Sequence, residues 1–174
     1  MTDSKGGEMK LSLEEWTRDK TWADRYVPAI REVIDKVASK IVNIQVATAQ
    51  EDAENATDYI ITLETGTIAC RIRRPNCNFR DLTLRAWRSS GAKTELEKIK
   101  EGHGKYYLYA WAKDADTFAD WIFVDLDKFR ESKLPFRNRT LIKNPDGTTG
   151  FINFKIPELL YWNCIIKRGL DVED

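Results

Sequence analysis

The sequence predicts an α+β fold, in which helices flank a mixed β-sheet that contains a three-strand antiparallel meander. An early segment repeats apolar residues at helical spacing, and the middle of the chain alternates polar and apolar residues as strands do. A short helical segment then separates the meander from two further strand-like runs. No internal repeat divides the 174 residues, so we expect one domain with its own packed core.

The first predicted helix runs from about residue 22 to about residue 43. Its apolar residues recur at the i, i+3, i+4, i+7 spacing of an amphipathic helix: Val27, Ile30, Val33, Ile34, Val37, Ala38, Ile41 and Ile44. Asp24 is expected to cap this helix, and Pro28 fits its first turn, where a missing N–H costs nothing. Residues 1–15 are expected to be a disordered leader.

Three strands are predicted to form the meander. The runs 59–63 and 68–73 alternate in polarity and flank the turn sequence ETGT, and residues 79–88 are expected to add the third strand. A short helix then follows, with Thr94 as its cap and Gly102 as its stop. Because a crossover through a helix usually makes a parallel pair, the sheet should be mixed when the strand runs 105–113 and 119–126 join it.

The remainder of the chain is predicted to pack on a core formed by residues 16–130. A short helix is expected over residues 127–133. Residues 131–174 are assigned as a C-terminal unit, with a hairpin around residues 144–147 and a last apolar helix over residues 157–168 that Pro157 opens.

The composition excludes several classes of protein. No apolar run approaches the roughly 20 residues that span a bilayer, and the first ten residues lack the apolar region of a secretory signal. Three cysteines without a Cys-x-x-Cys pair argue against both a disulfide framework and a zinc site. We therefore expect a cytoplasmic protein with no membrane partner.

Charge is balanced over the chain but not along it. Lys and Arg together number 28, as do Asp and Glu. Between Arg71 and Arg88 there are six arginines and one acid, Asp81, whereas acids gather over residues 51–54 and 114–127. A neutral chain can thus carry a basic face that binds nucleic acid, although a charge run is also typical of an ordinary solvated surface.

Two short segments carry a resemblance to a known family. Asp58 directly precedes the first predicted strand, and Ala69-Cys70-Arg71 lies on the second. With the order of the elements, this resembles the PD-(D/E)XK, or restriction-endonuclease-like, superfamily, whose core is a helix, a three-strand meander, a helix and a further strand. In that family an Asp begins one meander strand and an E-x-K motif lies on the next. Here Ala69 replaces the family's Glu, and Arg71 its Lys.

The resemblance covers about residues 22–130. In addition, the segments ATDYIITLETGTIACRIRR and GAKTELEKIKEG look like parts of uncharacterised phage-encoded proteins, which implies a phage or prophage origin.

The resemblance implies an endonuclease that hydrolyses phosphodiester bonds in DNA with Mg²⁺ or Mn²⁺. The residues then expected to be catalytic are Asp58, Arg71 and Glu95. The expected metal ligands are Asp58 with Asp52 or Asp81, while Glu51 and Glu95 are further candidates for the second ligand. The arginines expected to contact the nucleic-acid backbone are Arg73, Arg74, Arg85 and Arg88.

Each of these residues also has an ordinary structural interpretation. Asp58 could be a turn residue before a strand, and Glu95 could be a first-turn carboxylate of its helix. Asp81 shares a strand face with Arg85, and we expect the two to pair. His103 is expected to be an exposed loop residue without a catalytic role.

Two other functions remain open from the sequence. One is a non-catalytic module on the same fold, which binds nucleic acid or a host protein. The other is an inhibitor or assembly protein that uses the acidic segment 114–127 as a nucleic-acid mimic. The partners left open are accordingly DNA, a host protein and a second copy of the chain.

Overall fold

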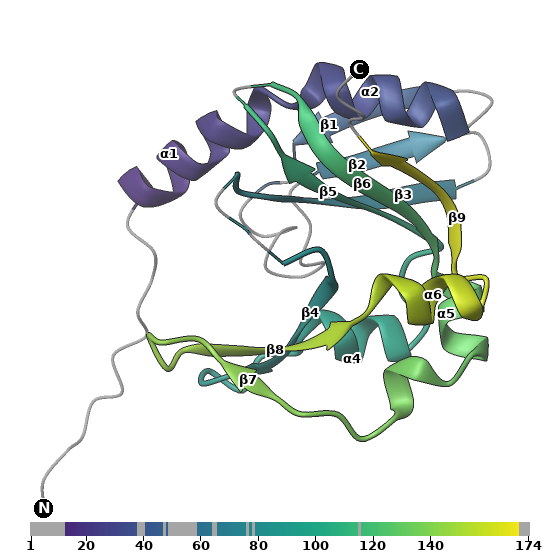
Figure 1. Cartoon of the computed structure of the whole chain (residues 1–174). Coiled ribbons are helices and arrows are strands. Elements are labelled where there is room, and N and C mark those ends of the chain that lie inside the picture. The colour runs from purple at the N-terminus through teal and green to yellow at the C-terminus, as the bar shows by residue number, and fades with distance from the viewer. Residues whose placement is uncertain are drawn as a thin grey trace, which may run out of the picture.

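The computed structural model (Figure 1) describes residues 13–37, 41–46, 48, 59–63, 66–75, 77, 79–114 and 116–170. Within these ranges the chain forms two β-sheets and several short helices, which confirms the α+β class and the mixed sheet. The larger sheet has six strands in the order β1-β2-β3-β5-β6-β9, and the smaller has three in the order β4-β8-β7.

The strands of the larger sheet are β1 (Ile41–Val46), β2 (Tyr59–Leu63), β3 (Gly66–Arg73), β5 (Tyr106–Ala112), β6 (Phe118–Asp125) and β9 (Ile165–Leu170). Those of the smaller sheet are β4 (Leu82–Arg88), β7 (Ile142–Lys143) and β8 (Thr149–Phe154). The helices are α1 (Leu13–Asp24), α2 (Val27–Val37), α4 (Glu95–Lys100), α5 (Leu126–Glu131), the 3₁₀ helix η1 (Leu134–Phe136) and α6 (Ile156–Tyr161).

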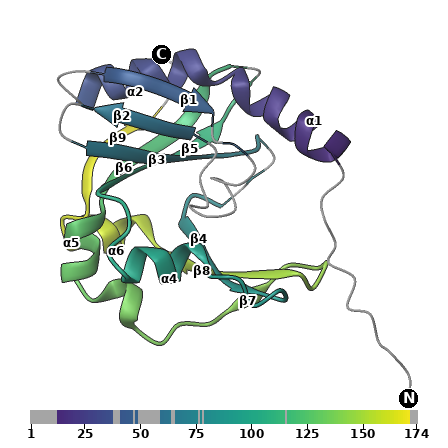
Figure 2. The ribbon, with the colours of Figure 1, turned by 180° about the vertical axis from the view of Figure 1, so that it is seen from behind.

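Other elements lie on both sides of the larger sheet (Figures 1 and 2), and its strands β5 and β6 bury side chains on both faces. On one face α2 packs Ile30, Val33 and Ile34 against strand residues such as Leu108. On the other face lies a second core, to which the smaller sheet and helices α4, α5 and α6 contribute: Leu84, Phe154, Leu96, Phe129 and Leu159 are among its members. Side chains that alternate along β3 and β5 therefore enter two different environments.

The long helix predicted over residues 22–43 is wrong. The structure has two helices, α1 and α2, which are separated at Arg25 and Tyr26, and β1 begins at Ile41. Pro28 explains the break, because a proline ring clashes with the carbonyl four residues earlier and ends a continuous helix there. Residues 13–15, which were assigned to the leader, belong to α1.

The three-strand meander exists but is formed by different strands. It consists of β1, β2 and β3, whereas the predicted third strand, β4, pairs with β8 in the smaller sheet. The far edge of β3 is occupied by the parallel strand β5. Residues 107–112 are buried on both faces of β5, a pattern typical of a central strand, whereas β4 has only one fully apolar face.

The C-terminal helix is shorter than predicted. It ends at Tyr161, and Asn163 adopts a positive φ of 53°, after which residues 165–170 form the edge strand β9 beside β6. Gly169 permits this pairing, because an added Cβ would lie 2.2 Å from Trp121 Nε1. The predicted hairpin is confirmed, with Gly147 at a φ of 66° between β7 and β8.

Candidate functional site

The predicted residues Arg71 and Glu95 meet in a polar cluster between the larger sheet and α4. Nη1 of Arg71 lies 2.8 Å from Oε2 of Glu95, and the same oxygen accepts the backbone N–H of Arg85 at 3.0 Å. The hydroxyl of Tyr107 donates to the other oxygen, Oε1. Both carboxylate oxygens of Glu95 therefore have strong donors, and its side chain is only 2% exposed.

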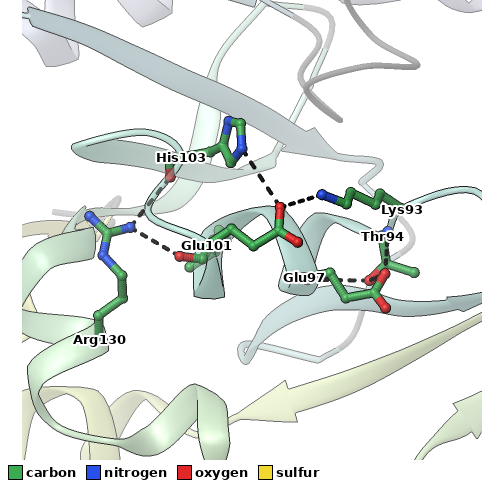
Figure 3. A network of polar contacts seen from close by, with 7 residues as sticks. Lys93, Thr94, Glu97, Glu101, His103 and Arg130 are labelled. Carbon is green, nitrogen blue, oxygen red and sulfur yellow. Dashed lines mark hydrogen bonds and ion pairs between the residues drawn. The ribbon is translucent and has the colours of Figure 1, made fainter.

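The start of α4 explains how Glu95 comes to face the sheet. Thr94 is the N-cap, as predicted, and forms a capping box with Glu97, whose carboxylate accepts the backbone N–H of Thr94 at 2.7 Å (Figure 3). Glu95 follows the cap directly, in the turn where the helix dipole favours a negative charge. The carboxylate of the capping box is thus Glu97, which leaves Glu95 available to Arg71.

Removing the cap should weaken this arrangement in a pH-dependent way. Thr94→Ala is expected to cost about 1 kcal/mol of unfolding free energy at pH 7. Hydrogen bonds from the backbone N–H and the hydroxyl of Thr94 lower the pKa of Glu97. Stability from the ionised Glu97 is therefore present above the ordinary glutamate pKa and is lost as the pH falls through the lower folded pKa. Urea unfolding of both proteins at pH 7 and pH 3 should show the difference shrinking in acid.

A second polar contact joins the two sheets beside this cluster. The hydroxyls of Thr83 on β4 and Tyr109 on β5 lie 2.5 Å apart and are buried. Burial raises the pKa of Tyr109, against the lowering effect of Arg73 and Arg71. Burial also raises the pKa of Tyr107 well above its usual value, and the charge of Glu95 adds to that shift. Both tyrosines are thus neutral hydrogen-bonding groups at physiological pH.

A bulge in β4 places two predicted arginines on one face. Arg85 lies opposite Phe151 and Arg88 lies opposite Thr149, with the register shift between Arg85 and Trp87. Positions 149 and 151 are two apart on β8 and so share a face, and their partners share it with them. Arg88, rather than Trp87, therefore lies on the same face of β4 as Arg85. Strict alternation along the strand would have placed Trp87 there.

These arginines and those of β3 lie around the contact between the sheets. Arg71 and Arg73 share one face of β3, opposite Tyr109 and Trp111 of β5. Nε of Arg88 is buried and has no hydrogen-bond partner within the described part of the chain. An unpaired buried N–H costs free energy, so the Arg88 side chain has an unmet hydrogen-bonding requirement at Nε.

Arg74 lies elsewhere. Its guanidinium stacks on the ring of Trp22 in α1, with 4.9 Å between the guanidinium carbon and the ring centroid. Trp22 packs on the face of the larger sheet that α2 covers. Arg74 therefore lies on the other side of the sheet from the polar cluster of Arg71 and Glu95.

The predicted pair between Asp81 and Arg85 is wrong. Oδ2 of Asp81 lies 2.7 Å from Nζ of Lys155, and the Asp81 side chain is 11% exposed. Lys155 directly follows β8, whose Phe154 pairs with Leu82, so the β4–β8 register brings this lysine to Asp81. The candidate ligands Asp58 and Asp52, and Glu51 with them, lie outside the described residues.

The cluster also contains residues that the sequence analysis did not select. These are Tyr107 and Tyr109 on β5 and Thr83 on β4, for which the sequence predicted no functional role. The tyrosines in the run YYLYAWA carried one signal, since a buried tyrosine hydroxyl needs a hydrogen-bond partner. His103 is 62% exposed, as expected, and its Nε2 lies 3.8 Å from a carboxylate oxygen of Glu101 (Figure 3).

Within the described ranges, no group of three or more His, Cys, Asp or Glu side chains is arranged to hold a metal ion. No helix in that part of the chain has the length and apolar character needed to cross a membrane. Comparison with known proteins finds no family model, no curated protein and no solved structure that matches this chain.

Proposed function

We propose that this chain acts on DNA through a restriction-endonuclease-like core and hydrolyses phosphodiester bonds with Mg²⁺. The order of the elements supports this proposal. Helix α2 precedes the antiparallel strands β1, β2 and β3, and α4 precedes β5, which is parallel to β3. That is the helix, meander, helix and strand order of the family, with β4 inserted before α4.

The observation that carries the proposal is the contact between Glu95 and Arg71. Ala69 and Arg71 are two residues apart on β3 and therefore lie on the same face, the one that meets the smaller sheet. The carboxylate missing at position 69 is therefore supplied near Arg71 by Glu95, which reaches over from α4. Among the candidate second carboxylates within the described residues, Glu95 has this contact, whereas Asp81 pairs with Lys155.

The proposal also requires the carboxylate of Asp58 to lie near Arg71. Tyr59 pairs with Cys70 in the antiparallel register of β2 and β3. One further step in that register leads to Arg71, and the proposal requires the carboxylate of Asp58 at that step. Asp58 and Glu95 would then approach the guanidinium of Arg71 from two sides.

Mg²⁺ prefers carboxylate oxygens and retains several waters, so the two carboxylates of Asp58 and Glu95 are the donors that the proposal requires. A metal held by Asp58 and Glu95 would supply Lewis-acid charge and an activated water. Arg71 would stabilise negative charge that develops on the scissile phosphate, because its guanidinium stays protonated throughout. Arg73, Arg85 and Arg88 would position the DNA backbone.

A second candidate is a non-catalytic nucleic-acid-binding module on the same fold. The contacts of Glu95 favour this second candidate, because the two carboxylate oxygens already accept from three donors, on Arg71, Tyr107 and Arg85. In that case the carboxylate serves to hold the arginine-bearing strands together, and the basic face alone contacts the nucleic acid.

Binding of duplex DNA in EDTA tests what both candidates share. Gel shifts at several salt concentrations should give an affinity that falls steeply with salt. Arg88→Gln should weaken binding and reduce the slope of log K against log salt by about 1, since one phosphate contact is lost. Lys36→Gln, on α2 and paired with Glu32, should leave the slope unchanged. A wild-type chain without salt-sensitive binding would contradict both candidates and leave a mimic or a protein partner.

A further inference from the structure

The segment 128–143 is the second basic region of the chain. It contains six cations and one acid, Glu131; the cations are Lys128, Arg130, Lys133, Arg137, Arg139 and Lys143. It comprises most of α5, η1 and the strand β7 with the connection between them, and it is separate from the arginines of β3 and β4.

Cations of this segment, and Lys100 of α4, lie over exposed aromatic rings. Phe136 is 51% exposed, and the ammonium groups of Lys100 and Lys133 each lie 5.8 Å from its ring centroid. Trp162 is 39% exposed, and the guanidinium carbon of Arg137 lies 5.4 Å from its ring centroid.

A third ring, Tyr161, extends the same region. It is 78% exposed and meets Trp162 edge-on, with 5.4 Å between the ring centroids. We call these residues the aromatic–basic surface: Lys100, Lys133, Phe136, Arg137, Tyr161 and Trp162. Glu158 is the acid beside it and is already paired with Arg139 at 2.5 Å, as well as with Arg137 at 3.6 Å.

The backbone beneath this surface is held in place. Arg130 of α5 donates to the carbonyls of Ile99, His103 and Gly104 at the end of α4, at 3.2, 3.4 and 3.1 Å. Figure 3 shows its contact with His103. These three hydrogen bonds hold α5 against the end of α4. In η1, Leu134 and Pro135 are buried whereas Phe136 remains outside. The exposed ring of Phe136 is therefore held in position by the buried residues that precede it in η1.

We propose that the aromatic–basic surface binds single-stranded nucleic acid, with unpaired bases stacked on the exposed rings and phosphates on the cations. Three rings with accessible area, interleaved with cations, offer both contacts that a single strand needs. In a duplex the bases stack on each other and cannot reach the rings, so this surface discriminates between the two forms. The proposal stands apart from phosphodiester hydrolysis, because it uses neither Arg71 nor Glu95.

Fluorescence anisotropy of a labelled 20-nucleotide oligo-dT, measured in EDTA, tests the proposal. Phe136→Ala and Tyr161→Ala should each weaken binding by about 10-fold, as expected when one base loses its stacking ring. Leu160→Ala is the matched control, because Leu160 precedes Tyr161 on α6 and is 48% exposed but has no ring. The control should bind like the wild type, and circular dichroism should show that each variant is folded.

Two results would overturn the proposal. The first is a wild-type chain that does not bind the oligonucleotide, which would point to a protein partner for this surface. The second is a Leu160→Ala variant that loses as much affinity as Tyr161→Ala, which would show that apolar contact rather than stacking is lost. Cleavage plays no part in either readout, so failure of the hydrolytic proposal leaves this one standing.

Discussion

Glu95→Ala is expected to lower the free energy of unfolding by about 3–5 kcal/mol, the usual cost of removing one partner from a buried ion pair. The variant removes the carboxylate that accepts from the guanidinium of Arg71, the hydroxyl of Tyr107 and the backbone N–H of Arg85. Because these groups come from β3, β5 and β4, the loss affects the junction of the two sheets. Urea unfolding followed by circular dichroism measures the change.

Two variants make this measurement specific. Glu95→Gln keeps the shape and one acceptor oxygen, so its cost should lie between the wild type and the alanine variant. Glu32→Ala removes a carboxylate from an exposed pair, where the side chain of Glu32 is 69% exposed, and should cost no more than about 1 kcal/mol. A Glu95→Ala protein as stable as Glu32→Ala would mean that the cluster does not hold the sheets together.

Glu95→Gln is expected to slow metal-dependent DNA cleavage by about 100-fold or more, because loss of a direct ligand should cost at least as much as loss of an outer-shell partner, which costs about 10–100-fold. Binding of the same duplex in EDTA should be nearly unchanged, because the arginines remain. Single-turnover cleavage rates and gel shifts, measured at a temperature where the variant is fully folded, separate these two effects.

Asp81→Asn is the comparison for this variant. Asp81 was the other described candidate for the second metal ligand, and its contact with Lys155 places it with β8 rather than with Arg71. We expect Asp81→Asn to cleave at the wild-type rate. Loss of cleavage in Asp81→Asn with retention in Glu95→Gln would assign the second carboxylate to Asp81 instead.

Local patterns in the sequence predicted many of the elements. The alternation in residues 59–63 and 68–73, the cap at Thr94 and the turn at Gly147 all act through neighbouring residues, and the structure contains each of them. The encounter of Arg71 with a carboxylate was also foreseeable, because adjacent cations on a strand face need an anion between them. The identity of the carboxylate that pairs with Arg71 could not be predicted, because it depends on where α4 packs.

Features that depend on pairing between distant segments were not predictable from one sequence. Residues 41–46 satisfy a helical spacing, and only pairing with β2 makes them a strand. Strand β4 leaves the meander because β5 occupies the edge of β3 and β8 offers it another partner. The bulge that brings Arg88 to the face of Arg85 arises in that same β4–β8 register.

Cleavage of supercoiled plasmid by the wild type and by Asp58→Ala, each with Mg²⁺, Mn²⁺ or EDTA, tests phosphodiester hydrolysis most directly. We expect the wild type to nick or linearise the plasmid with either metal and to leave it intact in EDTA, and we expect Asp58→Ala to be inactive under all three conditions. A wild-type chain that shifts DNA without cutting it would contradict hydrolysis and favour the binding module. Equal cutting by both proteins would contradict the role of Asp58.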